Sequence, residues 1–271
     1  MALTAGIVGL PNVGKSTLFN AITQAGAEAA NYPFATIDPN VGTVEVPDER
    51  LTKITELIKP KKTIPTTFEF TDIAGIVKGA SKGEGLGNKF LANIRESDFV
   101  DPIADIDTIN LELILADLES VNKRYARVEK IARTQKDKDA ILEFKVLEKI
   151  KPVLEAGKSA RTVDFEEDEL KVVKSLFLLT TKPVLYVANV SEDEVGEPDN
   201  IDYVKQIRDF AATENADTVV ISARVEEEIA ELEDDEKAEF LEAIGLTESG
   251  VDKLTQVAYH LLGLGTYFTA G

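Results

Sequence analysis

Short apolar segments alternate along most of the chain with segments whose hydrophobic residues recur every three or four positions. The short segments are rich in β-branched and aromatic residues, which favours strands, and the others have the spacing of helices. The strands are expected at residues 4–8, 41–46, 66–71, 183–190 and 218–222, and the helices at 15–24, 87–96, 201–212 and 251–262. This alternation predicts an α/β fold with a mostly parallel sheet and helices on both of its faces.

The pattern changes between residues 105 and 179, where no strand or turn signal interrupts a charged, helical sequence. The coiled-coil spacing appears at Leu111, Ile114, Leu118, Val121, Tyr125, Val128 and Ala132 and, after the polar segment 133–139, at Ala140, Phe144, Leu147, Ile150 and Leu154. Two long antiparallel helices fit this pattern, with a shorter third helix near 168–179. We therefore expect one domain made of residues 1–100 and 180–271, and an inserted helical domain with a coiled-coil arm at 101–179.

The segment SDFVDPIAD (97–105) does not fit a doubly wound sheet. Such a sheet requires another buried strand after the predicted helix 87–96, but the segment offers only Phe99 and Val100 before an Asp-Pro turn. Either the sheet lacks a strand here or residues are missing from the sequence. We favour missing residues.

Composition limits the classes of protein that the chain can represent. It has 271 residues, a net charge of −19, 44% hydrophobic residues and no cysteine. The cysteine count excludes disulfides and thiolate zinc sites, and no apolar run approaches the ~18 residues of a membrane span. We therefore expect a cytoplasmic protein that binds neither membranes nor DNA, since a strongly acidic surface repels phosphate unless a local basic patch reverses the charge.

The sequence GLPNVGKS (9–16) matches the phosphate-binding pattern GxxxxGK[ST] between a predicted strand and a predicted helix. Its glycines allow backbone N–H groups to turn toward phosphate oxygens, and the helix directs its positive dipole end at them. Lys15 is expected to reach the β- and γ-phosphates and Ser16 to bind Mg²⁺. Residues 1–100 and 180–271 are thus predicted to form a P-loop NTPase domain, whose phosphate contacts come from Asn12, Val13, Gly14, Lys15, Ser16 and Thr17.

Two downstream segments complete the predicted magnesium and γ-phosphate site. FEFTDIAG (68–75) places Asp72 at the end of a strand, where its carboxylate holds Mg²⁺ through water, and Gly75 allows the backbone to approach the γ-phosphate. Thr36, in the loop NYPFATIDPNVG, is a second candidate hydroxyl ligand for Mg²⁺. The glycine-rich residues after Gly75 have the composition of a nucleotide-sensing switch.

Three motifs together resemble the YchF family of Obg-like, ribosome-binding ATPases, a branch of the translation-factor NTPases. They are GLPNVGKST, NYPFATIDPNVG and DIAGIVKGASKGEGLGNKFL. The resemblance continues to the end of the chain at HLLGLGTYFTAG. It implies a G-domain-like P-loop NTPase fold and a ribosomal partner on the large subunit. It also implies a further C-terminal TGS domain, which this sequence does not contain.

The expected base-recognition segment is NVSE (189–192), at the end of a predicted strand. Guanine-specific relatives use NKxD there. In this chain Val190 replaces the lysine that covers the base, and Glu192 replaces the aspartate that accepts two guanine N–H groups, which should weaken guanine binding. The resemblance implies ATP, with Asn189 and Glu192 near adenine and Ser222-Ala223 as the last nucleotide-binding loop. The plain alternative is that NVSE is a surface loop.

Hydrolysis is expected to be slow because Ile76 occupies the position at which related GTPases place a water-orienting glutamine. An isoleucine cannot hydrogen-bond to water, so another group, a cation or a partner must assist. Asn12 matches the P-loop asparagine with which potassium-activated relatives hold K⁺. It fits a simple turn residue equally well.

Positive charge concentrates between residues 122 and 138, in the outer part of the predicted helical arm. The basic residues there are Lys123, Arg124, Arg127, Lys130, Arg133, Lys136 and Lys138, against Glu129 and Asp137. This surface suits RNA phosphate, and ribosome binding in the family favours that interpretation over a solvated coiled-coil surface. The acidic segment 226–242 is interpreted as a solvated helical face.

These observations predict a magnesium-dependent ATPase that acts as a ribosome-associated switch, with Lys15, Asp72 and Gly75 as the catalytic residues and Ser16, Thr36 and Asp72 around the metal. Two alternatives stay open. One is a GTPase of the Obg type that tolerates NxxE. The other is a nucleotide-gated scaffold in which hydrolysis is incidental.

Overall fold

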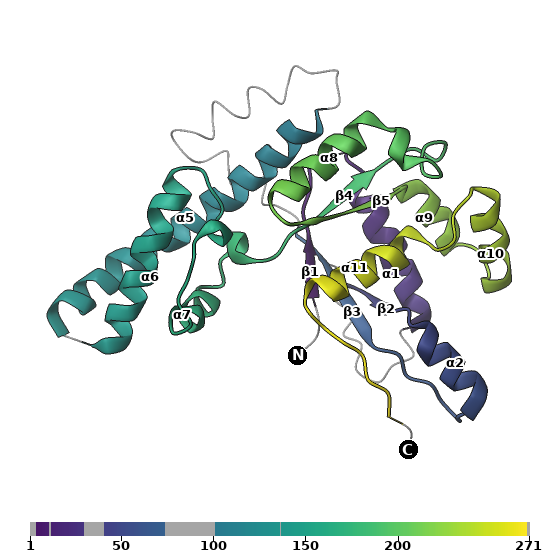
Figure 1. Cartoon of the computed structure of the whole chain (residues 1–271), viewed down its shortest axis with the longest axis horizontal. Coiled ribbons are helices and arrows are strands. Elements are labelled where there is room, and N and C mark those ends of the chain that lie inside the picture. The colour runs from purple at the N-terminus through teal and green to yellow at the C-terminus, as the bar shows by residue number, and fades with distance from the viewer. Residues whose placement is uncertain (1–3, 11, 30–40, 74–100, 136, 270–271) are drawn as a thin grey trace. The chain divides into compact units, whose positions relative to one another are not determined.

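The computed structural model describes residues 4–10, 12–29, 41–73, 101–135 and 137–269. The chain divides into two compact units (Figure 1). One unit contains Met1–Ala74 and Val184–Gly271, and the other contains Gly75–Pro183. No helix within the described ranges is both long and apolar enough to cross a membrane.

The N-terminal part of the first unit is a three-stranded sheet with two helices. The elements are β1 (Thr4–Ile7), α1 (Lys15–Ala29), β2 (Val41–Glu45), α2 (Glu49–Ile58) and β3 (Thr67–Asp72). The strand order is β1-β3-β2, with β1 parallel to β3 and β2 antiparallel to it. Ile7 lies opposite Asp72, so β1 and β3 end at the same edge.

The C-terminal part of this unit contains a second, two-stranded parallel ladder. Its elements are β4 (Leu185–Asn189), η5 (Pro198–Asn200), α8 (Asp202–Thr213), β5 (Asp217–Ile221), α9 (Ala223–Ala230), α10 (Asp234–Ala243) and α11 (Gly250–Leu261). Phe68 and Phe70 of β3 and Val219 and Ile221 of β5 belong to one buried apolar cluster with residues of α1 and α11. The two ladders therefore share a core.

The expected strands and helices that fall on described residues of this unit lie within a few residues of their predicted bounds, but two details differ. The antiparallel strand β2 makes the sheet more mixed than predicted. Helix α2 was not predicted; Asp48 caps it by accepting a hydrogen bond of 3.0 Å from the Arg50 N–H. The predicted helix 87–96 lies outside the described residues, as does the junction at Val100.

The acidic segment 226–242 is not one solvated helical face, which corrects the sequence interpretation. It spans two helices, α9 and α10. Glu226 is only 3% exposed and accepts hydrogen bonds from the backbone N–H groups of Gly250 (2.7 Å) and Val251 (3.0 Å). The carboxylate therefore caps the N-terminus of α11, and burial raises its pKa.

The second unit is helical and has its own core. It contains α5 (Pro102–Gln135), α6 (Lys138–Glu155), η3 (Ala160–Thr162), α7 (Glu169–Leu176) and η4 (Leu179–Thr181). Helices α5 and α6 pack side by side, with the rings of Tyr125 and Phe144 5.0 Å apart and an ion pair between Arg124 and Glu143. The core includes Val121, Val128, Leu147 and Ile150, all of which belong to the predicted coiled-coil seam.

Candidate functional site

The phosphate-binding motif occupies the turn between β1 and α1. Asn12 and Gly14 have positive φ angles of 65° and 87°, and α1 begins directly at Lys15. Asparagine and glycine are the residues that adopt this left-handed conformation most readily. A Cβ atom at Gly14 would also overlap the Asn189 side chain. The motif therefore has its glycine where both the backbone and its neighbour require one.

The structure brings Lys15 and Asp72 together at the shared edge of β1 and β3. Their side chains form an ion pair and are 17% and 18% exposed. Register explains the contact, because Asp72 ends β3 opposite the last residue of β1, and the turn then returns Lys15 to the same edge. Ser16 is exposed in the first turn of α1, and Thr17 is half-buried. A cation, a carboxylate and a hydroxyl thus surround the N-terminus of α1.

Asn189 ties this turn to the predicted base-recognition loops. Its Nδ2 donates to the Val13 carbonyl at 3.1 Å, and its Oδ1 accepts from the Ala223 N–H at 2.9 Å. One side chain at the end of β4 therefore links the phosphate-binding turn to the start of α9. Sequence reasoning placed Asn189 near the base but did not predict this structural role.

A cavity of about 340 Å³ lies beside Asn189, between the loop after β4 and the start of α9. Its lining residues are Asn189, Val190, Ser191, Glu192, Asp193, Ser222 and Arg224. Ser222 is 1% exposed, and its hydroxyl has no hydrogen-bond partner among the described residues. Val190 is 5% exposed and packs into the protein, so it does not cover the cavity as the lysine of NKxD would.

Arg224 lines the cavity but was not predicted from the sequence. Its Nε lies 2.6 Å from Glu192 Oε1, so the glutamate predicted to read the base is held in an ion pair. Its place in the sequence could have indicated it, since Arg224 directly follows the predicted nucleotide-binding loop Ser222-Ala223. Its partner could not be inferred, because Glu192 and Arg224 are 32 residues apart and meet only through the pairing of β4 with β5.

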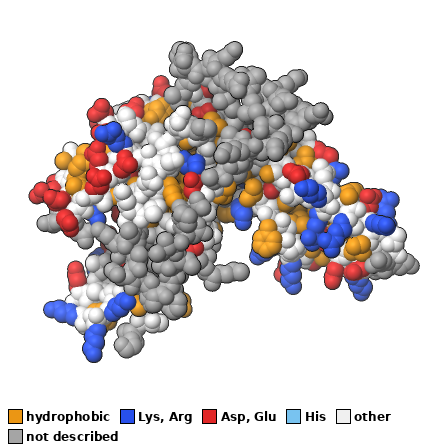
Figure 2. All heavy atoms as spheres, turned by 180° about the vertical axis from the view of Figure 1, so that it is seen from behind, with side chains coloured by type: hydrophobic (Ala, Val, Ile, Leu, Met, Phe, Trp, Pro, Cys, Tyr) orange, Lys and Arg blue, Asp and Glu red, His pale blue; other side chains and the backbone are white. Residues whose placement is uncertain are grey.

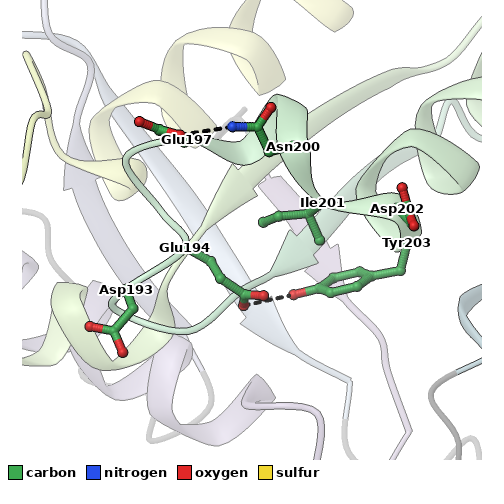
Figure 3. Close-up of a pocket in the computed structure, with 7 residues that line it drawn as sticks. All are labelled: Asp193, Glu194, Glu197, Asn200, Ile201, Asp202 and Tyr203. Atoms are coloured by element: carbon green, nitrogen blue, oxygen red, sulfur yellow. Dashed lines mark hydrogen bonds between the residues drawn. The ribbon is translucent and has the colours of Figure 1, made fainter.

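A neighbouring cavity of about 480 Å³ is lined by Asp193, Glu194, Glu197, Asn200, Ile201, Asp202 and Tyr203. In Figure 3 the Tyr203 hydroxyl points to Glu194, and Asn200 donates to Glu197 at 2.7 Å. Hydrogen bonds from Ser191 lower the pKa of Glu194, which keeps its charge. So much negative charge repels phosphate, and this cavity is not suited to a nucleotide.

Two predicted site residues, Thr36 and Gly75, lie outside the described residues, together with Ile76 and the glycine-rich segment that follows. Among the described residues, no group of three or more histidine, cysteine, aspartate or glutamate side chains could hold a metal. The oxygen donors that remain near Lys15 are the Asp72 carboxylate and the Ser16 hydroxyl. Both are hard oxygen ligands of the kind that Mg²⁺ prefers, and this ion usually completes its coordination with water and substrate phosphate oxygens.

The chain matches known proteins along its whole length. A family model described as "50S ribosome-binding GTPase" matches residues 4–149. The ribosome-binding ATPase YchF of Bacillus subtilis is 64% identical over 290 positions, which cover 100% of this chain and 79% of the relative. The chain belongs to the YchF family. The YchF protein of Escherichia coli O157:H7, also named a ribosome-binding ATPase, is 49% identical with the same coverage.

A solved YchF structure supports the fold as well as the family. The Schizosaccharomyces pombe YchF GTPase aligns with a TM-score of 0.82 and 36% identity, covering 100% of this chain and 78% of that one. The predicted YchF resemblance and the P-loop NTPase fold are thus confirmed. The bacterial alignments extend over 290 positions although this chain has 271 residues, so these relatives carry at least 19 residues that have no counterpart here.

Proposed function

We propose that this chain is a magnesium-dependent ATPase that acts as a ribosome-associated switch. The observation that carries the proposal is the convergence of three segments on the N-terminus of α1. Lys15 pairs with Asp72 there, and Asn189 fastens the phosphate-binding turn to the cavity beside β4. This arrangement offers a polyphosphate a helix N-terminus and a lysine, with a base cavity adjoining them.

Each residue around the phosphate would have a separate task. Lys15 would leave Asp72 to contact the β- and γ-phosphates, where its charge offsets the negative charge that develops during transfer. Ser16 and Asp72 would hold Mg²⁺, directly and through water, and Thr36 and Gly75 are proposed to sense the γ-phosphate. The metal, when bound, supplies charge neutralisation between the phosphates.

Hydrolysis is proposed to be slow, because Ile76 follows Gly75 at the position where related GTPases place a water-orienting glutamine. A potassium ion held by Asn12 stays a prediction. The left-handed backbone of Asn12 is explained by the turn itself, so its conformation does not favour the ion.

ATP is the proposed nucleotide because the NxxE segment departs from the guanine-reading pattern and because the bacterial relatives are named ATPases. GTP is the second candidate, since the family model and the S. pombe relative carry the name GTPase. Calorimetric titration with MgATP and MgGTP tests the choice. We expect ATP to bind more tightly, and tighter binding of GTP would reject the ATP assignment.

The proposed partner is the ribosome, through RNA of the large subunit and the basic side chains of α5. Figure 2 shows lysine and arginine side chains over the helical unit, among acidic ones. Three of the five basic residues between positions 123 and 133 are engaged within the unit, since Lys123 pairs with Glu119, Arg124 with Glu143 and Arg133 with Glu129. Arg127 and Lys130 are exposed and form no ion pair with the described residues. They are therefore the strongest candidates for phosphate contacts, and we propose that α5 and α6 serve as an RNA-binding arm.

A further inference from the structure

The ion pair between Glu192 and Arg224 connects the two loops that form the cavity beside Asn189. Glu192 follows β4 and Arg224 lies in the first turn of α9, with side chains that are 47% and 73% exposed. Arg224 Nε also lies 3.5 Å from Glu228 Oε1, so the same guanidinium nitrogen approaches two carboxylates. It supplies the positive charge of the cavity lining.

We propose that Arg224 determines the base preference of this site by occupying the Glu192 carboxylate. The proposal rests on the proposed function, because it requires the cavity to hold the base of the nucleotide. Arg224 is then a specificity-determining residue that acts partly through Glu192.

The chemistry of the two purines explains why the ion pair matters. Guanine presents two neighbouring N–H donors, and a free carboxylate can accept both. When one carboxylate oxygen is held by Arg224, that bidentate contact has to compete with the arginine. Adenine presents an amino donor beside a ring nitrogen acceptor. A carboxylate oxygen next to a guanidinium N–H matches that pair, since arginine has five N–H donors and the ion pair uses only some of them.

A second feature of the cavity indicates that it receives a polar ligand. The Ser222 hydroxyl lies in the lining, is almost fully buried, and has no hydrogen-bond partner among the described residues. Buried hydroxyl groups are normally paired, so a polar atom of the base would satisfy it. Asn189 holds both loops to the phosphate-binding turn, which fixes the distance between the two members of the ion pair and the phosphate site.

The test is the ratio of GTP to ATP affinity in Arg224→Met, measured by calorimetry with the magnesium nucleotides. Methionine keeps a long apolar side chain but removes the guanidinium. We expect the ratio to rise about fivefold, the scale of an exposed ion pair. Arg208→Met is the matched control, because Arg208 forms a comparable surface ion pair with Asp199 (2.5 Å) and does not line the cavity. It should leave the ratio unchanged.

A double variant separates this role from a structural one. In a Glu192→Gln background there is no carboxylate to release, so Arg224→Met should no longer raise the ratio. An unchanged ratio of GTP to ATP affinity in the single variant would overturn the inference. If the affinities for both nucleotides fell equally, Arg224 would instead be assigned to covering the base. A wild-type protein that binds neither nucleotide would instead reject the proposed function. If wild type prefers GTP, only the ATP assignment fails, because the shift is measured relative to wild type.

Discussion

At the scale of single residues, Gly14 is a position where the site tolerates little change. Its φ of 87° is unfavourable for any residue with a Cβ, and a Cβ there would overlap Asn189 Nδ2. Two separate penalties therefore apply. One is backbone strain, and the other is loss of the Asn189–Val13 hydrogen bond that shapes the phosphate-binding turn.

Gly14→Ala should weaken ATP binding at least tenfold, whereas Gly245→Ala should not. Gly245 has a similar φ of 78° but open space where its Cβ would lie, so it reproduces the strain without the overlap. Both variants should lose about 1–2 kcal/mol of stability from the left-handed backbone. Calorimetric ATP titration and thermal melting of the two proteins check the prediction. Equal ATP affinity in both would show that Gly14 matters only for its backbone.

At the scale of secondary-structure elements, a buried carboxylate joins α6 to α7. The Glu169 side chain is fully buried, accepts from Lys149 Nζ at 2.6 Å and from the Glu166 N–H at 3.0 Å, and lies 3.1 Å from Lys145 Nζ. The hydrogen bond from Lys149, the Glu166 N–H and the pairing with Lys145 lower the pKa of Glu169 from 4.5 to about 2. Its charged form is therefore strongly favoured in the folded unit.

This pKa predicts how the stability of the helical unit depends on pH. Because the folded pKa is lower than the unfolded one, Glu169 stabilises the fold fully above pH 4.5, and the contribution is lost as the pH falls toward 2. Hydrogen exchange of the α6 and α7 amides in wild type and Glu169→Gln measures it. The protection lost in the variant should be large at pH 5.5 and smaller at pH 3. An equal difference in protection between wild type and Glu169→Gln at pH 5.5 and pH 3 would contradict the prediction.

Most elements follow from the local hydrophobic pattern. The exceptions depend on contacts between segments that are distant in the sequence. The strands and the long helices were expected because their apolar periodicity is sustained. The antiparallel pairing of β2 was not, because register and direction depend on which strand edges meet. The acidic segment beginning at Glu226 suggested only solvent, yet that carboxylate is buried because the N-terminus of α11 supplies two N–H donors.

At the scale of the whole molecule, a net charge of −19 makes any binding to RNA depend on a local surface. Arg127 and Lys130 are three residues apart, so they lie on one face of α5. A phosphate backbone held there would be released by salt, since such binding is governed by counterion release.

Reversing both charges, as Arg127→Glu with Lys130→Glu, should markedly reduce ribosome co-sedimentation. ATP hydrolysis should be unchanged. The matched control is Lys171→Glu with Lys174→Glu, two exposed lysines with the same spacing on α7 of the same unit. The control should sediment like wild type. Equal sedimentation of all three proteins would remove α5 from the RNA hypothesis and favour a scaffold that binds a protein.

The sequence by itself determined the parts of this protein that depend on short stretches of chain. The P-loop pattern, the strand that ends in Asp72, the coiled-coil seam and the YchF motifs are all local, because hydrophobic period and turn chemistry act over a few residues. Only the tertiary structure decided which distant side chains meet. Lys15 pairs with Asp72, Asn189 fastens two loops, and Arg224 holds Glu192, since each contact requires strands far apart in sequence to end at one place.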